Sequence, residues 1–169
     1  ISVMSDKVRI RAIRTEEIPL LCDFLYEAIY RPPKWPTLPR TIIQHPSVWR
    51  YIKNFGEQRG DLALVAEVDN IIIGAVWVRY MMGYGHIDVH TPELSIAIYP
   101  DYRNKGIGSR LLVEMLRTLQ ESGITSVSLS VNKGNPAVTL YRRIGFYIHR
   151  ENDDEYIMVR ALQSINRIQ

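Results

Sequence analysis

The sequence predicts an α+β domain in which a mixed, mostly antiparallel seven-stranded sheet contains one parallel pair of strands. The first observation is a hairpin: residues 61–68 and 71–81 are two predicted strands joined by Asp69-Asn70, which tolerate a left-handed turn. The second is a single crossover, in which strand 93–98, a long amphipathic helix and strand 125–131 follow one another. A crossover of that kind makes the two strands parallel.

The chain opens with an alternating strand at residues 8–13. Thr15 is a suitable N-cap for a helix that continues to about Tyr30, with acidic residues in its first turn. Residues 31–39 contain four prolines and are expected to be irregular. A second helix is predicted over residues 46–55, before the hairpin.

Gly74 in the second hairpin strand indicates a bulge or a close approach of backbone. Residues 82–90 follow, and His86-x-Asp88-x-His90 would place three potential ligands on one face of a strand. A metal site is not favoured, because zinc requires further ligands and the lone cysteine lies elsewhere. A polar loop at the mouth of a cleft is the preferred interpretation.

The long helix begins at Gly106 and Gly108 and ends at Gly123. Its apolar positions follow the period of one helix face: Ile107, Leu111, Leu112, Met115, Leu116 and Leu119. Asn135-Pro136 then marks the start of a short helix that ends at Gly145, and strands 146–150 and 155–160 form a closing hairpin.

A glycine-bearing turn between a strand and a helix makes an anion site, because unpaired N–H groups and the helix dipole point at the ligand. Arg103 and Lys105 add positive charge at the same place. The P-loop pattern is absent, since no Gly-Lys-Ser/Thr follows at the required spacing. The dinucleotide fingerprint fits only in part, because Leu111 stands where its third glycine belongs.

Composition places the chain among globular proteins. The 169 residues, 46% hydrophobic and 23% charged, are expected to form a single domain, 1–169, in which residues 1–3 before Met4 read as a cloning remnant. No apolar run approaches the ~18 residues of a membrane span, and no secretory leader is evident. The single cysteine, Cys22, fits core packing in a reducing cytoplasm. The net charge of +3 is scattered, which favours a small polyanion over nucleic acid.

Arg103-Asn104-Lys105-Gly106-Ile107-Gly108 resembles the Arg/Gln-x-x-Gly-x-Gly/Ala motif of the GNAT superfamily of acyl-CoA transferases. Residues 130–146, with Asn135, Ala137, Tyr141 and Gly145-Phe146, resemble the second motif of that superfamily. The order of elements from about Val8 to Arg160 is also similar to the GNAT order. The resemblance implies the GNAT fold, with helices on both faces of the sheet and central parallel strands that splay apart around a pantetheine arm.

The resemblance further implies acetyl-CoA as cosubstrate, without a metal. The backbone of residues 96–98 would bind the pantetheine, and the amides of residues 105–108 with Ser109 would bind the pyrophosphate. The full set of expected cofactor-binding residues is Ile96, Ala97, Ile98, Arg103, Asn104, Lys105, Gly106, Ile107, Gly108, Ser109, Asn132, Asn135, Ala137 and Tyr141. Asn135 can alternatively cap its own helix.

The implied chemistry is acetyl transfer to a primary amine by direct attack. An amine of the lysine type, with a pKa near ~10.4, must lose a proton before it attacks. Glu93 matches the position of a general base in several family members, and His86 and His90 are alternatives. Tyr141 matches the general acid that protonates the leaving thiolate. A backbone N–H freed by a bulge near Ile98 would stabilise the oxyanion.

The acceptor cannot be read from the sequence. Residues 30–40, 80–90 and 151–156 are expected to shape its pocket, and the candidate substrate-binding side chains are Trp35, Tyr80, Tyr84 and Asp88. Their chemistry suits a cationic group beside an apolar or aromatic portion, in a small molecule or a peptide. The alternative function is a non-catalytic acyl-CoA sensor or scaffold of the same fold. A homodimer is compatible with the resemblance, whereas nucleic-acid and membrane partners are not expected.

Overall fold

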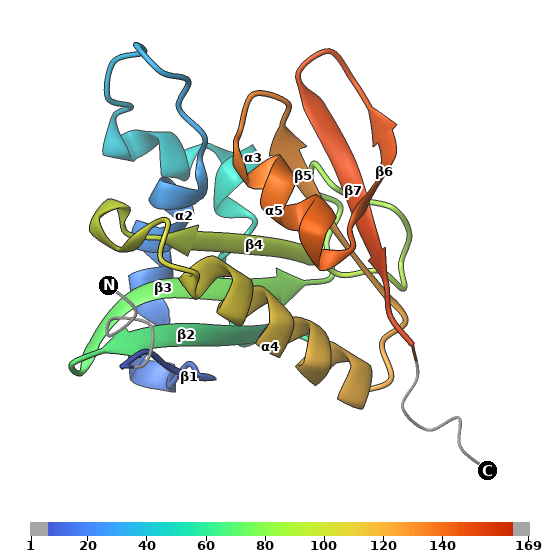
Figure 1. Ribbon diagram of the computed structural model, residues 1–169, viewed down its shortest axis with the longest axis horizontal. Coiled ribbons are helices and arrows are strands. Elements are labelled where there is room, and N and C mark those ends of the chain that lie inside the picture. The colour runs from blue at the N-terminus through green and yellow to red at the C-terminus, as the bar shows by residue number, and fades with distance from the viewer. Residues whose placement is uncertain (1–6, 164–169) are drawn as a thin grey trace.

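A computed structural model describes residues 7–163, so the expectation for residues 1–3 lies outside the described residues. The described chain forms one seven-stranded sheet with the order β1-β2-β3-β4-β5-β7-β6 (Figure 1). The strands are β1 (Arg9–Ala12), β2 (Leu62–Val68), β3 (Ile71–Arg79), β4 (Glu93–Ile98), β5 (Ser126–Asn132), β6 (Tyr147–Glu151) and β7 (Glu155–Ala161). Only β4 and β5 are parallel among them, which confirms the predicted fold class.

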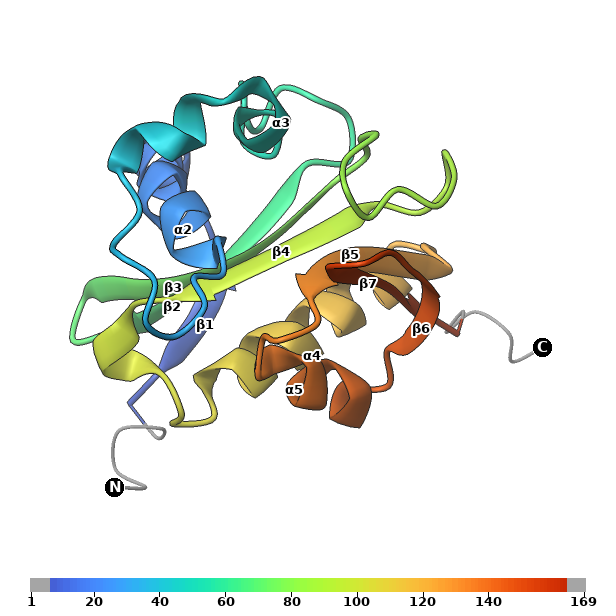
Figure 2. The same ribbon diagram turned by 90° about the horizontal axis from the view of Figure 1, so that it is seen from above.

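Helices cover both faces of the sheet (Figure 2). One face carries α4 (Ile107–Glu121) and α5 (Ala137–Ile144), and the other carries α2 (Leu21–Ala28) and α3 (Pro46–Trp49). Each face has its own apolar core. The core under α4 is built on its buried stripe of Ile107, Leu111, Leu112, Met115, Leu116 and Leu119, as the helical period predicts.

The parallel pair is joined at one point only. Glu93 pairs with Ser128, where Ser128 donates its N–H to the Pro92 carbonyl at 3.0 Å, and beyond this point β4 and β5 diverge. Figure 2 shows the resulting wedge between the sheet of β1–β4 and the strands β5, β7 and β6. The sheet therefore opens at its centre, between the two helical layers.

The helix predicted over residues 15–30 is shorter and divided. A 3-10 turn, Thr15–Leu20, precedes α2, and the N-cap is Arg14 rather than Thr15. The Glu17 carboxylate accepts the Arg14 N–H at 2.8 Å, which starts the turn one residue earlier. Pro19 has no N–H to donate, so an α-helical ladder cannot pass through it.

The helix predicted over residues 46–55 ends at Trp49, and the chain beyond it forms separate turns. The buried Arg79 guanidinium donates to the carbonyls of Arg50 and Lys53, at 3.0 and 2.7 Å. A continued helix would use these same carbonyls, and Asn54 (φ 52°) turns the chain away from helical geometry. A 3-10 turn, Arg40–Gln44, also precedes α3.

The β2–β3 hairpin forms as predicted, with Asp69 and Asn70 both at positive φ. Its register skips Ile73, beside Gly74, so the predicted bulge is present. The bulge predicted near Ile98 is absent, because β4 pairs with β3 in unbroken register from Glu93 to Ile98. Central-strand N–H groups are exposed by the divergence of β5 instead.

Candidate active site

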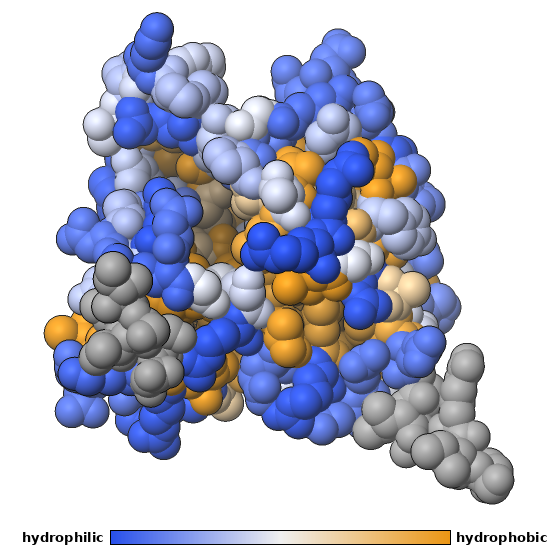
Figure 3. Space-filling view, in the orientation of Figure 1, coloured by the Kyte–Doolittle hydropathy of each residue, from blue (hydrophilic) through white to orange (hydrophobic). Residues whose placement is uncertain are grey.

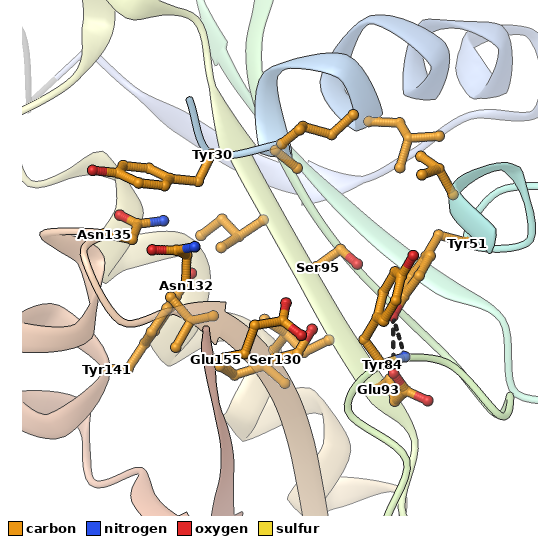
Figure 4. A pocket seen from close by; sticks show the side chains of 18 residues that line it. Tyr30, Tyr51, Tyr84, Glu93, Ser95, Ser130, Asn132, Asn135, Tyr141 and Glu155 are labelled. Atoms are coloured by element: carbon orange, nitrogen blue, oxygen red, sulfur yellow. Dashed lines mark hydrogen bonds between the residues drawn. The ribbon is translucent and has the colours of Figure 1, made fainter. Parts of the chain in front are cut away.

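A cavity of about 350 Å³ lies where β4 and β5 diverge. The space-filling view shows a hollow between two lobes of the molecule (Figure 3), and Figure 4 shows the side chains that line the cavity. Its polar lining comes from both strands and from distant segments: Tyr30, Tyr51, Tyr84, Glu93, Ser95, Ser130, Asn132, Asn135, Tyr141 and Glu155. No lysine, arginine or histidine belongs to this lining among the described residues.

Side chains from both faces of the sheet line the cavity. Alternation along the strands puts Ser95 on the α2 side, since its neighbours Leu94 and Ile96 belong to the core under α4. Glu155 pairs with Asn132 across β7 and β5, so these two side chains share a face. Tyr141 arrives from the opposite face, because it lies on α5 and packs in the core under α4.

The backbone of β4 is open toward the wedge. Tyr99 donates its N–H to Ile73 on β3, so the alternate residues Ile96 and Ile98 direct their backbone groups away from β3, toward the departed β5. The Ile98 carbonyl accepts the Arg103 Nε at 2.9 Å. Ala97, also expected to bind cofactor, directs its backbone to β3 and its side chain to the core under α2.

The N-terminus of α4 presents unpaired backbone amides. Within residues 7–163, the N–H groups of residues 105–109 have no backbone or side-chain acceptor. Gly106 has φ 83°, and a Cβ placed there would meet nothing within 4 Å. Asn104, at φ 61°, completes the turn. The buried Ile107 anchors the helix beneath the amides, so the turn forms a rigid, outward-facing anion cradle.

Two of the predicted pyrophosphate contacts, the side chains of Arg103 and Ser109, form hydrogen bonds within the protein. Arg103 pairs with Glu27 on α2 at 3.1 Å, besides its bond to Ile98. Ser109 Oγ accepts from Arg143 at 3.3 Å, which brings a cation from α5 to the cradle. The exposed side chain of Lys105 extends from the same turn. The cradle thus combines backbone amides with cations from two elements.

Tyr141 is 8% exposed and lies edge-on to Phe146, with ring centroids 5.9 Å apart. Removal from water raises its pKa to about 12. Asn135 Oδ1 accepts the Ala137 N–H at 2.9 Å at the start of α5, which leaves its amide NH₂ group to donate to a ligand. Asn132 Oδ1 accepts the Gly134 N–H at 2.8 Å in the same way. Ala137 packs against the core.

Glu93 is 2% exposed and ties down the loop that follows β3. Its carboxylate accepts the N–H groups of Gly83 and Gly85, at 2.7 and 2.9 Å, and the Tyr51 hydroxyl at 3.2 Å. Burial, then the nearby Glu93 charge, raises the pKa of Tyr51. A Cβ at Gly83 would lie 2.6 Å from both the Glu93 carboxylate and the Tyr51 hydroxyl. This Glu93 cluster is tightly packed.

One of the four predicted acceptor residues lines the cavity. Tyr84 does, stacked on Tyr51 and donating to Ser47 Oγ at 2.8 Å. Trp35 is 57% exposed and lies outside, while Tyr80 packs over Gly60. Asp88 is exposed and caps a turn by accepting the His90 N–H at 2.9 Å. These three do not belong to the cavity lining.

His86 and His90 lie in a loop rather than on a strand, and neither lines the cavity. His86 Nδ1 contacts the Met81 carbonyl at 3.1 Å. Within the described range no cluster of three metal-ligating side chains occurs. None of the helices in residues 7–163 is both long enough and apolar enough to cross a bilayer.

The sequence reasoning does not identify Tyr51, Ser95 and Ser130 as lining residues, whereas Tyr30 lies in the expected segment 30–40. The sequence places Tyr51 on a helix that does not form there, and it places Ser130 on a strand at the start of the second motif without assigning its side chain to the pocket. The alternation of Ser126, Ser128 and Ser130 indicates that these side chains share one face of the strand, and of the three only Ser130 lines the cavity. Glu155 lies in the expected segment 151–156 but was not singled out.

The comparisons with known proteins agree with this geometry. Residues 24–146 match the acetyltransferase (GNAT) family. An N-alpha-acetyltransferase of Sulfurisphaera tokodaii is 31% identical over 114 residues, which are 58% of this chain and 68% of that protein. The ribosomal protein bS18-alanine N-acetyltransferase of Haemophilus influenzae is 40% identical over 93 residues, 55% of this chain and 58% of that protein.

Solved structures share the fold. The PaiA N-acetyltransferase of Thermoplasma acidophilum, in complex with coenzyme A, has a TM-score of 0.65 and 22% identity over 91% of this chain and 98% of its own. The ribosomal-protein-S18-alanine N-acetyltransferase of Escherichia coli has a TM-score of 0.66 and 19% identity over 96% and 99%. The matched residues 24–146 include both motifs and the central wedge, and the chain therefore belongs to the GNAT family of acetyltransferases.

Proposed function

We propose that this acetyltransferase moves an acetyl group from acetyl-CoA to a primary amine by direct attack in a ternary complex. The observation that carries the proposal is the open anion cradle at the start of α4, next to a wedge that leads to Tyr141. Unpaired amides favour a diphosphate there, and Gly106 leaves room for it to approach.

Acetyl-CoA would supply the activated acyl carbon. The amides of residues 105–109 would bind its pyrophosphate, with Lys105 and Arg143 adding charge. The backbone of Ile96, open toward the wedge, would bind the pantetheine. Tyr141 would donate a proton to the leaving sulfur, since its raised pKa keeps it protonated at neutral pH.

The cavity on the α2 side would receive the amine. Its carboxylates and hydroxyls, without a cationic side chain, favour a positively charged group, and its tyrosines favour an apolar neighbour. One relative described above is named an N-alpha-acetyltransferase and the other an N-acetyltransferase of an alanine of ribosomal protein bS18, which supports the α-amino group of a peptide as one acceptor. The ε-amine of lysine and small amines fit the same chemistry.

The test has two parts, both on the full chain. Calorimetry with CoA measures binding, and a thiol-release assay with acetyl-CoA and a panel of primary amines measures turnover. We expect both signals. CoA binding without thiol release on any amine would support the non-catalytic module, whereas absence of CoA binding would contradict the family function at this site.

A further inference from the structure

Glu155 stands apart from the other carboxylate of the cavity in its surroundings. The Glu93 carboxylate is hydrogen-bonded to the loop that follows β3: each oxygen accepts a backbone N–H, and the residue is almost fully buried. Glu155 lines the same cavity from the start of β7 and has no ion-pair partner within residues 7–163. Its neighbour in contact is Asn152, an uncharged side chain of the same turn.

The direction of the side chain matters as much as its partners. Glu155 on β7 pairs with Asn132 on β5. Figure 4 shows the Glu155 carboxylate pointing into the cavity, between Asn132 and Tyr84. Tyr141 enters from the opposite face of the sheet. A proton acceptor and a proton donor thus stand on opposite sides of the wedge.

We propose that Glu155 binds the ammonium group of the acceptor and takes its proton, so that the acceptor is a cationic primary amine entering on the α2 side. This rests on the acetyl transfer proposed above. A carboxylate in a cavity without cationic side chains is the strongest electrostatic partner available to an ammonium ion. The Ser95 and Ser130 hydroxyls lie on the same lining and can bind the remaining N–H groups.

The proton balance follows from these positions. The ammonium gives one proton to Glu155, and the freed nitrogen lone pair forms the C–N bond as the C–S bond breaks. The sulfur leaves with a proton from Tyr141, and the second proton of the nitrogen restores Tyr141 through solvent. Glu155 then releases its proton to water. The products are an amide, a thiol and one proton.

The charges around Glu155 set its titration. Burial, as the largest effect, raises the pKa of Glu155, the Asn152 bond opposes this, and Asp154 in the same turn adds to it. A carboxyl with a raised pKa is a better base toward an amine. The other titratable groups nearby are Lys133 with its partner Glu151 at 2.9 Å, and the lining residues Tyr30, Tyr51, Tyr84, Glu93 and Tyr141.

The decisive variant is Glu155→Gln, which keeps the shape and removes the charge and the base. The assay is the pH profile of kcat/KM with acetyl-CoA and tyramine or a tetrapeptide with a free amino terminus. We expect a loss of about 100-fold or more at pH 7. The loss should shrink toward pH 10, where the amine is increasingly unprotonated without help. Glu155→Asp should restore part of the activity.

Asp153→Asn, in the same exposed turn, is the matched control and should leave the profile unchanged. An aniline acceptor, already unprotonated at pH 7, should be acetylated almost equally by wild type and Glu155→Gln. CoA affinity measured by calorimetry shows whether each variant is folded. If Glu155→Gln is not folded, the pH profile of Glu155→Asp carries the test.

Equal kcat/KM of wild type and Glu155→Gln at pH 7 would overturn the proposal, and so would a deficit of the same size at pH 7 and pH 10. A wild-type chain without thiol release on any amine would instead contradict the proposed function itself. The two failures are therefore distinguishable.

Discussion

Replacing Glu93 by glutamine separates an anchoring carboxylate from a catalytic base. Glutamine has one acceptor oxygen, whereas the Glu93 carboxylate accepts two backbone N–H groups and a tyrosine hydroxyl. At least one buried N–H would lose its acceptor, at a cost of about 1–3 kcal/mol, and the remaining bonds would lose their charge assistance. A total near 3 kcal/mol corresponds to a fall in Tm of about 6–12 °C for a chain of this size.

Thermal denaturation followed by circular dichroism measures the first effect, and amine kinetics measure the second. We expect Glu93→Gln to lower Tm and to raise the KM for the amine, because the loop that carries Tyr84 is loosened. The acidic limb of the kcat/KM profile should keep its midpoint. Gly83→Ala, which clashes with the same carboxylate without removing a titratable group, should reproduce the pattern.

Glu121→Gln on the exposed end of α4 is the control for loss of charge. The reasoning is refuted if Glu93→Gln keeps the Tm of the wild type while kcat falls about 100-fold and the acidic limb disappears, as expected of a lost general base. Glu93 would then be the base that the family resemblance implies.

Three further predictions concern the cradle, the acid and the first strand. Gly106→Ala puts a Cβ at φ 83° and should lower the free energy of unfolding by about 1–2 kcal/mol. Calorimetry should also show at least tenfold weaker CoA binding. Gly123→Ala, at φ 82° and equally open, should lower the stability without weakening CoA binding. Tyr141→Phe should lower kcat by about 10- to 100-fold with Tm retained, and an unchanged kcat would exclude the acid role. The Arg11 hydrogen bond lowers the pKa of Glu17 to about 2 from 4.5, so the stability that this pair contributes is complete above pH 4.5 and is lost as pH falls toward 2. Urea unfolding should show the difference in unfolding free energy between wild type and Glu17→Gln closing between pH 5 and pH 2. A constant difference would contradict the pairing.

Local patterns were sufficient for the parts of the fold that depend on local forces. The β2–β3 turn needs two residues that tolerate positive φ, and Asp69-Asn70 supplies them. The α4 stripe and its glycines predict both the helix and its anion site, since unpaired amides are a property of any helix start. The order of elements then determines which strands can be parallel.

Long-range contacts explain where the structure differs from the sequence reasoning. The helix after Pro46 is cut short by Arg79, a residue of β3 that takes two of its carbonyls. Glu93 reads as a strand-end carboxylate, yet the loop around Gly83 folds back over it. Trp35, Tyr80 and Asp88, predicted to contact the acceptor, are polar or aromatic loop residues, and residue type alone does not show which way a loop faces.

The joint between β4 and β5 has a mechanical consequence. The residue pair that joins β4 to β5, Glu93 and Ser128, includes the carboxylate that binds the wall bearing Tyr84. Gly85 in that wall lies so close to β5 that a Cβ would come within 2.9 Å of Leu129. A change that spread β4 from β5 at this point would displace that wall, so the width of the wedge and the position of Tyr84 are linked through the Glu93–Ser128 pair.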